Sequence, residues 1–531
     1  MSHAVGPTDP EVRNLTLGDL LTWAAETTPD RVALISGLPD RGARRQWTYA
    51  ELHAESVRTA HALLRRFRPG ERVAVWAPSS PEWIMVEFGA AMAGLVLVTV
   101  NPGFREHEVE YVLAQSKASG VVVRTEFRGN PMLATIEAIQ PRCPELREVI
   151  RFDQWDAFLD SAAGQPPALP TVDTNDAVMI QYTSGTTGSP KGALLHHRGL
   201  VNNGAHTLDR MGVRDGSVWV TTMPLFHTGG CAMCVLGAVS KRTTQVLVES
   251  FDPALVMELI ETYRCNGIAT VPTMLIAMLE HPNFESADLS SLEVLSCGAS
   301  TVPASLVTTF QQRLGATFTI LFGQTECSPV ATMTVPTDAV ADIAATIGKP
   351  LPHVEVRIAD PMTGETVPVG TIGELCTRGY HVMHGYFENP EATAATVDAD
   401  GWLHTGDLCA MDERGYCTIE GRLKDMIIRG GENIYPREVE ELLFAHPQVG
   451  DAAVVGIPDA RWGEEVAAFI RPAAGQRIDK NELVTYVRAH LAPHKTPRHW
   501  FEVDAFPLTG SGKIQKYKLR QMSTSGEVAE M

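Results

Sequence analysis

The sequence contains no uninterrupted apolar run of about 18 residues, the length that a membrane-spanning helix requires. Its most apolar stretch, residues 83–100, is broken by Glu87 and two glycines, which favours a buried helix followed by a strand. The N-terminal residues have no basic segment preceding an apolar one, and the C-terminal GEVAEM matches no lipidation or retention signal. We therefore expect a soluble cytoplasmic protein with no integral membrane association.

Basic residues are also in short supply. The chain has 44 Lys and Arg against 63 Asp and Glu, a formal net charge of -19. Because nucleic-acid binding depends on neutralising phosphates, this balance argues against a broad nucleic-acid surface.

Paired cysteine motifs are nearly absent. The nine cysteines form an odd number scattered over 531 residues, which fits reduced thiols in the cytoplasm. Cys231 and Cys234 have CxxC spacing, but no second pair follows at a zinc-binding distance. Their neighbours are apolar, so we expect both thiols to pack in the core.

Hydrophobic runs separated by helical patterns dominate the first two thirds of the chain. Such runs are typical of parallel strands covered on both faces, and they indicate an α/β fold. We expect strands at 72–77, 95–100, 120–123, 177–181, 218–222, 244–248 and 292–295, and a helix at 81–94.

The pattern changes after Ile372. Residues 373–378 and 416–420 read as short antiparallel strands, followed from Asp425 by a compact α+β pattern. That pattern comprises helices at 437–445 and 480–491 and strands at 452–457 and 466–470, and we expect the last dozen residues to fray. The expected fold is a large N-terminal portion of parallel-rich sheets with flanking helices and a small antiparallel β subdomain, followed by a C-terminal α+β domain.

A glycine-rich loop, TSGTTGSPKG at residues 183–192, follows one expected strand. Glycines allow backbone N–H groups to turn toward phosphate oxygens, hydroxyls add donors, and Lys191 adds positive charge. The loop is not a Walker motif, because Pro190 precedes the lysine and Gly192 follows it. These donors and the lysine suit a polyanion site of another class, whereas composition alone would favour an ordinary Ser/Thr/Gly surface turn.

This loop resembles the signature of the adenylate-forming superfamily of acyl-CoA synthetases, adenylation domains and luciferases. Four further stretches resemble the family's other motifs in the same order: LFGQTE ending at Glu326, GWLHTGD ending at Asp407, GRLKD ending at Asp425 with GGENIYP after it, and LTGSGK ending at Lys513. The sequence stretches IQYTSGTTGSPKGA and GENIYPREVEE are most similar to those of the medium-chain fatty acyl-CoA synthetases.

The resemblance implies a two-step reaction with ATP, Mg²⁺ and CoA as cofactors or co-substrates. A carboxylic acid is first activated as acyl-AMP with release of pyrophosphate, and the acyl group then passes to a thiol. It also implies an AMP-binding domain at 1–423 and a mobile C-terminal lid at 424–531 that rotates about a hinge at Lys424 between the two steps.

The resemblance assigns most nucleotide-binding roles residue by residue. ATP phosphates are expected against Thr183, Ser184, Gly185, Thr186, Thr187, Gly188, Ser189, Pro190 and Lys191. Adenine is expected near Gly298, Ala299, Ser300, Phe322 and Gly323, and the ribose hydroxyls on Asp407 with Arg422 beside them. Thr325 is expected on the α-phosphate, and Glu326 as the Mg²⁺ ligand, since hard oxygen donors suit that ion.

Lys513 is the expected catalytic residue of adenylation, because a lysine can bridge the attacking carboxylate and the α-phosphate. Gly430 and Gly431 are expected to line the CoA tunnel, with an ordinary β-turn as the alternative reading. Residues 490–520 carry six basic side chains against Glu502 and Asp504, which suggests a basic edge for ATP and CoA phosphates.

The PLFHTGG stretch that starts at Pro224 indicates which class of carboxylic acid is the substrate. It lacks the acidic residue by which amino-acid-activating members pair the substrate ammonium, and an unpaired ammonium would be costly in an apolar pocket. A medium-chain fatty acid or a bulky cyclic acid fits better. The expected acyl pocket is lined by Phe226, His227, Cys231, Met233 and Met274, with His227 either a gate to the carboxylate or a packed histidine.

Two alternatives remain open at this point. A free-standing adenylation enzyme would load the phosphopantetheine of an acyl carrier protein, which shares its thiol arm with CoA. A non-catalytic nucleotide-binding protein would be expected to have broken motifs, whereas Lys191, Glu326, Asp407, Arg422 and Lys513 are all present. A homodimer is expected from the family alone.

Overall fold

The computed structural model describes residues 1–531 except 165, 184–189, 299–301, 303 and 508–513. The chain divides into two compact units. The larger unit contains residues 4–356 and 377–403, and the smaller unit contains residues 1–3, 357–376 and 404–531.

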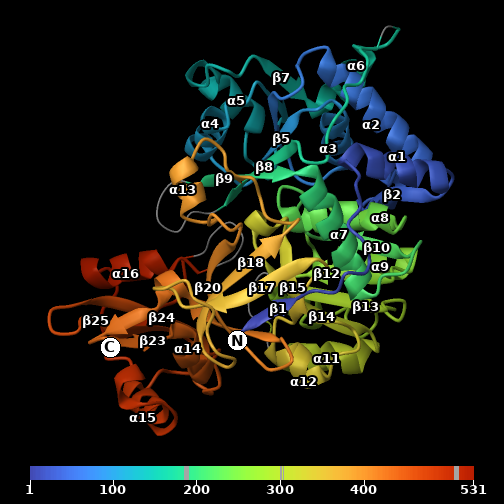
Figure 1. The fold of residues 1–531 in the computed structure, drawn as a ribbon. Helices are drawn as coiled ribbons and strands as arrows, with labels where there is room; N and C mark the ends of the chain where they lie inside the picture. Colours follow the sequence, from blue (N-terminus) through green and yellow to red (C-terminus); the bar gives the residue numbers. More distant parts are fainter. Residues whose placement is uncertain (165, 184–189, 299–301, 303, 508–513) are drawn as a thin grey trace. The chain divides into compact units, whose positions relative to one another are not determined.

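The larger unit contains a seven-stranded sheet in the order β19-β9-β8-β5-β4-β6-β7 (Figure 1). Strands β8, β5, β4, β6 and β7 are parallel, and β9 and β19 continue the sheet in antiparallel pairing. The bounds are β4 Arg72–Trp76, β5 Val96–Val100, β6 Gly120–Val123, β7 Glu148–Arg151, β8 Ala177–Thr183, β9 Lys191–His196 and β19 Gly385–Tyr386.

A second sheet of this unit has nine strands in the order β16-β15-β14-β13-β12-β10-β11-β2-β3. Its central strands are parallel, while β3 at one edge and β15 and β16 at the other are antiparallel. The bounds are β2 Val32–Ser36, β3 Gln46–Thr48, β10 Val218–Thr221, β11 Thr244–Leu247, β12 Gly267–Thr270, β13 Val294–Gly298, β14 Thr317–Gly323, β15 Val330–Met333 and β16 Lys349–Pro350.

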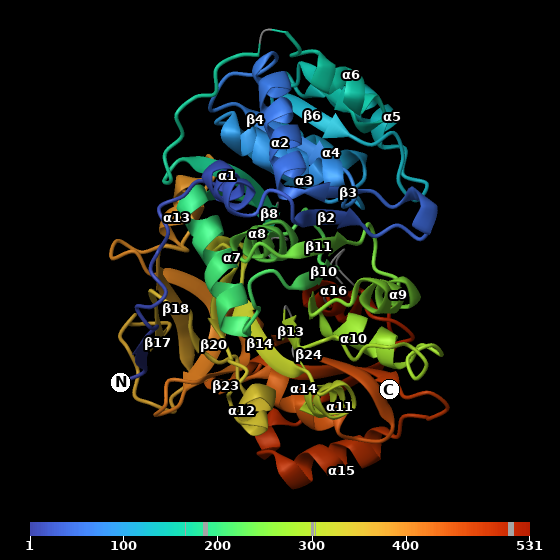
Figure 2. The ribbon, with the colours of Figure 1, turned by 90° about the vertical axis from the view of Figure 1, so that its right-hand side faces the viewer.

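Helices cover these sheets, as Figures 1 and 2 show. Their bounds are α1 Leu17–Thr27, α2 Tyr49–Leu64, α3 Pro81–Met92, α4 Glu106–Gln115, α5 Met132–Ile139, α6 Trp155–Asp160, α7 His197–Met211, α8 Gly237–Ser240, α9 Pro253–Tyr263, α10 Pro272–Leu279, α11 Ala304–Leu314, α12 Val340–Ala345 and α13 Pro390–Ala394. Local signals fix their starts. In α3, for example, the Ser80 hydroxyl accepts from the Trp83 N–H, and Pro81 occupies the first helical position.

The apolar runs of the central strands are buried on both faces, which explains their lack of polar alternation. All five residues of β5 and all four of β6 are buried. The predicted α/β class is confirmed here, and the predicted strands agree with the observed ones to within a few residues.

A five-stranded sheet follows the order β1-β17-β18-β20-β21. The bounds are β1 His3–Val5, β17 Val354–Ala359, β18 Gly373–Gly379, β20 Leu403–Met411 and β21 Cys417–Arg422. Strands β20 and β21 pair antiparallel, as predicted for this part of the chain.

The C-terminal part of the smaller unit is a sheet in the order β23-β22-β25-β24, with β26 parallel to β25. The bounds are β22 Ile427–Arg429, β23 Glu432–Ile434, β24 Val449–Asp459, β25 Gly463–Pro472, β26 His499–Glu502, α14 Pro436–Phe444, α15 Lys480–His490 and α16 Lys516–Ser525. Val454 belongs to a core with residues of α14 and α15, and Val455 to another with Leu519 of α16, so both sheet faces are covered.

The expectation that the last dozen residues fray is wrong. Helix α16 continues to Ser525, and the Met531 N–H donates to the Trp500 carbonyl at 2.8 Å. Lys480 Nζ donates to the Met531 carbonyl at 2.5 Å. The terminal segment is held because Leu519 is fully buried against the sheet, a tertiary contact that its polar composition conceals.

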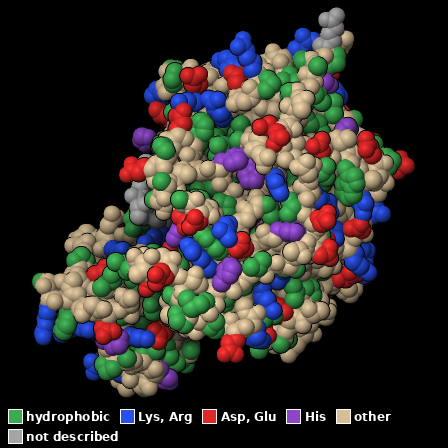
Figure 3. Space-filling view, in the orientation of Figure 1, with side chains coloured by type: hydrophobic (Ala, Val, Ile, Leu, Met, Phe, Trp, Pro, Cys, Tyr) green, Lys and Arg blue, Asp and Glu red, His purple; other side chains and the backbone are tan. Residues whose placement is uncertain are grey.

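Among the described residues, no helix is both long enough and apolar enough to cross a membrane. On the face drawn in Figure 3, basic and acidic side chains of the described residues are interspersed. The predicted domain boundary and the mobility of the lid stay predictions.

Candidate active site

The predicted phosphate-binding loop joins β8 to β9. These strands pair antiparallel, with Thr183 opposite Lys191, and the Thr183 hydroxyl donates to the Lys191 carbonyl at 3.4 Å. The Tyr111 hydroxyl donates to the Pro190 carbonyl at 2.8 Å. The loop residues Ser184, Gly185, Thr186, Thr187, Gly188 and Ser189 lie outside the described residues, whereas both of its ends are fixed by strand pairing.

Glu326, the predicted Mg²⁺ ligand, lies in a 3₁₀ turn, Thr325–Cys327, that follows β14. It is 7% exposed, and its Oε1 accepts a hydrogen bond from the Tyr386 hydroxyl at 2.6 Å. The backbone of the same residue is held as well, since the Met383 N–H donates to the Glu326 carbonyl at 3.0 Å. A carboxylate positioned in this way supplies the hard oxygen that Mg²⁺ prefers.

Tyr386 connects the end of the predicted phosphate-binding loop to Glu326. Lys191 Nζ lies 5.0 Å from the centre of the Tyr386 ring, a cation–π distance. Burial and the neighbouring Glu326 charge both raise the pKa of the Tyr386 phenol, so it remains a donor at neutral pH. The structure thus brings Lys191 and Glu326 to the same tyrosine.

Sequence reasoning missed Tyr386. Its position is set by β19, where Tyr386 pairs with Ala193 of β9. A two-residue strand has no periodicity to recognise, and its partner is nearly two hundred positions away, so only the folded structure reveals it.

The two strands predicted near adenine are parallel neighbours. Gly298 ends β13 opposite Leu321 of β14, and the next residue, Phe322, is 8% exposed. A Cβ at Gly298 would lie 2.6 Å from Leu321 Cδ1, and one at Gly323 would lie 2.0 Å from the Pro329 carbonyl oxygen. Close backbone packing therefore accounts for both glycines. Ala299 and Ser300 lie outside the described residues.

The predicted acyl-pocket stretch contains two neighbouring rings that are tilted by 41° to each other. The Phe226 and His227 ring centres are 4.4 Å apart, and the Thr99 hydroxyl donates to the Phe226 carbonyl at 2.9 Å. A π-helix, Gly229–Leu236, follows directly and carries Cys231 and Met233. Helices of this kind are rare and often occur at functional sites.

The CxxC cysteines pack in the core, as predicted. Both are free and fully buried, and burial raises the pKa of each thiol, for Cys234 to about 12. Gln181 Nε2 donates to Cys231 Sγ at 3.1 Å. Met233 is buried on the same π-helix, whereas Met274 lies partly exposed on α10.

A second missed residue is Glu87 of α3, which is 1% exposed. Neither carboxyl oxygen has a hydrogen-bond partner among the described residues. Burial raises its pKa well above the usual value, and its charge in turn raises the pKa of Cys231. The sequence marks it only as a charge within an apolar run.

In the smaller unit, Asp407 and Arg422 face each other on β20 and β21. Arg422 Nε lies 3.0 Å from Asp407 Oδ1, and the Asp407 side chain is nearly buried while that of Arg422 is half exposed. The structure therefore brings together Asp407, which the resemblance assigns to the ribose hydroxyls, and Arg422, which it assigns to the support of the nucleotide.

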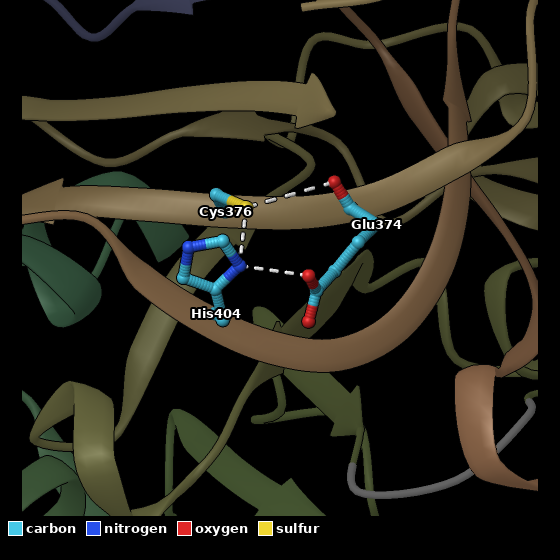
Figure 4. Close-up of side chains that lie close together, drawn as sticks. All are labelled: Glu374, Cys376 and His404. Atoms are coloured by element: carbon cyan, nitrogen blue, oxygen red, sulfur yellow. Dashed lines mark hydrogen bonds and ion pairs between the residues drawn. The ribbon is translucent and has the colours of Figure 1, made fainter. Parts of the chain in front are cut away.

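Beside Asp407, the side chains of Glu374, Cys376 and His404 form a cluster, shown in Figure 4. His404 Nδ1 lies 2.8 Å from Glu374 Oε2 and 3.5 Å from Cys376 Sγ. These hydrogen bonds to Cys376 and Glu374 raise the pKa of His404 to about 10. Sulfur, nitrogen and oxygen donors could surround a metal ion, but these side chains already hydrogen-bond to one another, so we interpret the group as a hydrogen-bonded cluster.

The predicted hinge residue Lys424 lies in a 3₁₀ turn, Leu423–Asp425. Burial, with a further contribution from Arg422, lowers its pKa to about 8. Gly430 and Gly431 form the turn between β22 and β23 with φ of 61° and 90°, and a Cβ at Gly430 would lie 2.7 Å from Trp462. The turn itself requires these glycines, and a tunnel role stays a prediction.

The predicted basic edge is partly neutralised. Lys495 pairs with Glu438, Arg498 with Glu465, and Lys516 with Glu440. Counting charges within one segment missed these acidic partners because they come from α14 and β25. Lys513 lies outside the described residues.

Comparison with known proteins identifies the family. The sequence model of the AMP-binding enzymes matches residues 21–387, and that of the AMP-binding enzyme C-terminal domain matches residues 438–513. The chain is 41% identical to YngI of Bacillus subtilis (strain 168), a protein named as an acyl-CoA synthetase, over 96% of this chain and 97% of that protein.

Two further relatives agree. The medium-chain acyl-CoA ligase ACSF2, mitochondrial, of Rattus norvegicus is 35% identical over 98% of this chain and 89% of its own length. The ATP-bound structure of MatB from Rhodopseudomonas palustris superposes with a TM-score of 0.86 and 29% identity, covering 96% of this chain and 99% of that one. Together with the motifs and the fold, these matches show that the chain belongs to the AMP-binding enzyme family and is an AMP-forming acid–thiol ligase of the acyl-CoA synthetase type.

Proposed function

We propose that the enzyme activates a hydrophobic carboxylic acid, either a medium-chain fatty acid or a bulky cyclic acid, and transfers it to CoA. In the first step a carboxylate oxygen attacks the α-phosphorus of ATP, and the bond to pyrophosphate breaks. In the second step the CoA thiolate attacks the acyl carbonyl, and AMP leaves with the bonding electrons. Both steps gather negative charge, so catalysis depends on positioning and neutralisation.

The observation that carries this proposal is the Lys191–Tyr386–Glu326 arrangement at the end of the β8–β9 hairpin. It supplies a cation and a carboxylate close to the loop that we expect to bind the β- and γ-phosphates. Mg²⁺ bound at Glu326 would neutralise phosphate charge, and Tyr386 keeps that carboxylate oriented. Thr325, one residue before, is proposed to donate to the α-phosphate.

The remaining roles follow the sequence prediction. Asp407 accepts from the ribose hydroxyls with Arg422 beside it, and Phe322 stacks on adenine beside Gly298, Ala299, Ser300 and Gly323. Lys513 bridges the attacking carboxylate and the α-phosphate during adenylation. A rotation about Lys424 then brings Gly430 and Gly431 to the pantetheine arm for the second step.

The substrate class is supported by the chemistry of the predicted pocket. Phe226, Cys231 and Met233 present an aromatic ring and sulfur atoms, which suit an alkyl chain or a fused ring. The stretch has no carboxylate to pair an amino-acid ammonium. The name of the rat relative, a medium-chain acyl-CoA ligase, supports the linear acid as the first choice.

CoA is the proposed acceptor, and a carrier-protein phosphopantetheine is the alternative. The cytoplasm is the proposed compartment, which the nine free cysteines support.

The test incubates purified enzyme with Mg²⁺, ATP, one acid from a panel, and either CoA or a phosphopantetheinylated carrier protein, and detects the thioester by mass spectrometry. We expect acyl-CoA from a medium-chain acid and none from amino acids. Thioester on the carrier but not on CoA would replace the proposed acceptor, and product from amino acids alone would contradict the substrate class.

A further inference from the structure

The Glu374 carboxylate holds two points of the strand that carries Asp407. Glu374 Oε1 accepts the Gly406 N–H at 2.9 Å, and Oε2 accepts from His404 Nδ1 at 2.8 Å. Figure 4 shows Glu374 on β18 reaching the side chain of His404 on β20. Only 9% of the Glu374 side chain is exposed, and hydrogen bonds to a charged acceptor in such a setting are strong.

These contacts fix an unusual piece of backbone. Gly406 has a φ of 71°, a conformation that β-strand residues rarely adopt. The Thr405 hydroxyl donates to the Leu375 carbonyl at 2.7 Å and accepts the Asp407 N–H at 3.1 Å. On the neighbouring strand β21, Arg422 Nε lies 3.0 Å from the Asp407 carboxylate. The orientation of Asp407 is therefore set from both sides.

We propose that Glu374 is a positioning residue for nucleotide binding, which holds the His404–Gly406 segment so that Asp407 presents its carboxylate to the ribose hydroxyls of ATP. This inference rests on the proposed role of Asp407. A carboxylate that must accept from two hydroxyl groups at once gains from being held in one orientation before the nucleotide arrives, because the ordering cost is then already met.

His404 pairs with the Glu374 carboxylate, and Cys376 lies beside His404. Hydrogen bonds to Cys376 and Glu374 raise the pKa of His404 to about 10, so at neutral pH the Glu374–His404 contact is an ion pair. Cys376 Sγ lies 3.5 Å from the same nitrogen, and its thiol donates to the Glu374 backbone carbonyl at 3.8 Å. Serine at this position keeps a donor of similar size and leaves the Glu374 carboxylate in place, so Cys376→Ser serves as the matched control.

The test compares full-length wild type with Glu374→Gln in ATP-dependent acyl-CoA formation, using ATP and 2′,3′-dideoxy-ATP as the nucleotides. Glutamine keeps the shape and loses the charge. With ATP we expect KM to rise about 10-fold and kcat to change less than about twofold, as for a weakened charged hydrogen bond. With dideoxy-ATP, which lacks the hydroxyls that Asp407 would bind, the two enzymes should differ by less than about twofold.

An equal KM rise with both nucleotides would overturn the proposal, because Glu374 would then only support the fold. If wild type does not distinguish ATP from dideoxy-ATP, the ribose role of Asp407 fails, and the inference fails with it. That outcome leaves acyl-CoA formation itself intact, so it is separable from failure of the ligase activity.

Three further variants keep the proposal testable if Glu374→Gln folds poorly. His404→Asn retains an N–H donor near the position of Nδ1 and should keep the KM for ATP near wild type, whereas His404→Leu should raise it about 10-fold. Cys376→Ser should leave KM unchanged. Loss of ATP binding in Cys376→Ser together with loss of stoichiometric zinc would overturn the proposal in favour of a metal site.

Discussion

Two carboxylates of the molecule, Glu326 in the larger unit and Glu374 in the smaller, are both nearly buried and both hydrogen-bonded, but their partners differ. Glu326 accepts from one tyrosine hydroxyl, and that tyrosine also contacts Lys191. Glu374 accepts from a backbone N–H and a histidine that are close neighbours of Asp407 in sequence.

The difference separates two ways in which a carboxylate could contribute to the proposed nucleotide binding. The partners of Glu326 leave it suited to bind a ligand directly, with the tyrosine fixing its direction. The partners of Glu374 engage both of its carboxylate oxygens within the protein, so we propose that it acts through Asp407. Substitutions should therefore affect catalysis strongly around Glu326 and nucleotide affinity around Glu374.

The largest effect is expected from Lys513, the proposed bridge between carboxylate and α-phosphate. Lys513→Ala should lower adenylation by at least about 100-fold, since a point charge on the transition state is lost. Thioester formation from supplied acyl-AMP should stay within about twofold of wild type, because no α-phosphate attack is involved. Pyrophosphate exchange and CoA acylation measure the two steps, and equal loss in both would make Lys513 a structural residue.

Glu326→Gln and Tyr386→Phe separate the contribution of the Glu326 carboxylate from that of the tyrosine hydroxyl that orients it. Glu326→Gln should lower kcat about 100-fold and raise the Mg²⁺ concentration required, because a metal ligand loses its charge. Tyr386→Phe keeps the ring beside Lys191 and removes only the hydroxyl, so we expect kcat to fall about 10-fold. Magnesium titrations of pyrophosphate exchange measure both. An effect on ATP affinity alone would place Glu326 in the same class as Glu374.

A hinge effect should appear in only one half-reaction. Lys424→Pro restricts the backbone where we predict rotation, so pyrophosphate exchange should stay within about threefold of wild type while CoA transfer falls about 10-fold or more. Lys424→Ala, which leaves the backbone free, is the matched control. Normal overall turnover by the proline variant would remove the hinge from the account.

We expect the smallest effect from a substitution of Glu87. Its carboxylate differs from those of Glu326 and Glu374, because it has no hydrogen-bond partner among the described residues. Its folded-state pKa is raised, so the folded protein binds this proton more tightly than the unfolded chain does. Burial of the charged carboxylate destabilises the folded protein. This free-energy penalty is absent below the pKa of the unfolded chain and grows as the pH rises above about 4.5. Glu87→Gln should therefore unfold with a free energy about 1 kcal/mol higher at pH 8, with a smaller gain at pH 5.

Urea unfolding at the two pH values measures this gain. Glu82→Gln on the same helix, where the side chain is partly exposed and lies 3.9 Å from Arg45, is the control. A gain for Glu87→Gln that does not depend on pH would show that its carboxyl is not the source of the penalty.

Sequence reasoning succeeded where the signal is local. Buried parallel strands such as Gly120–Val123 are continuous apolar runs, and the motifs that contain Lys191, Glu326 and Asp407 are contiguous stretches. Local periodicity and short motifs therefore define the class of the fold and the family.

Sequence reasoning failed where a residue depends on a distant partner. Tyr386 gains its role from a hydrogen bond across 60 positions, and Glu374 from a contact across 30. The C-terminal end was expected to fray because its composition is polar, yet Leu519 anchors it from within the core. Such partners are set by strand pairing and packing, which no short window of sequence contains.

ATP–pyrophosphate exchange at saturating medium-chain acid and ATP near its KM tests whether Glu326 and Asp407 serve the same adenylation step. The measurement compares wild type, Glu326→Gln and Asp407→Asn. We predict exchange by wild type, about a 100-fold loss in Glu326→Gln and about a 10-fold loss in Asp407→Asn that excess ATP restores. No exchange by wild type with any acid, or full activity in either variant, would contradict the account.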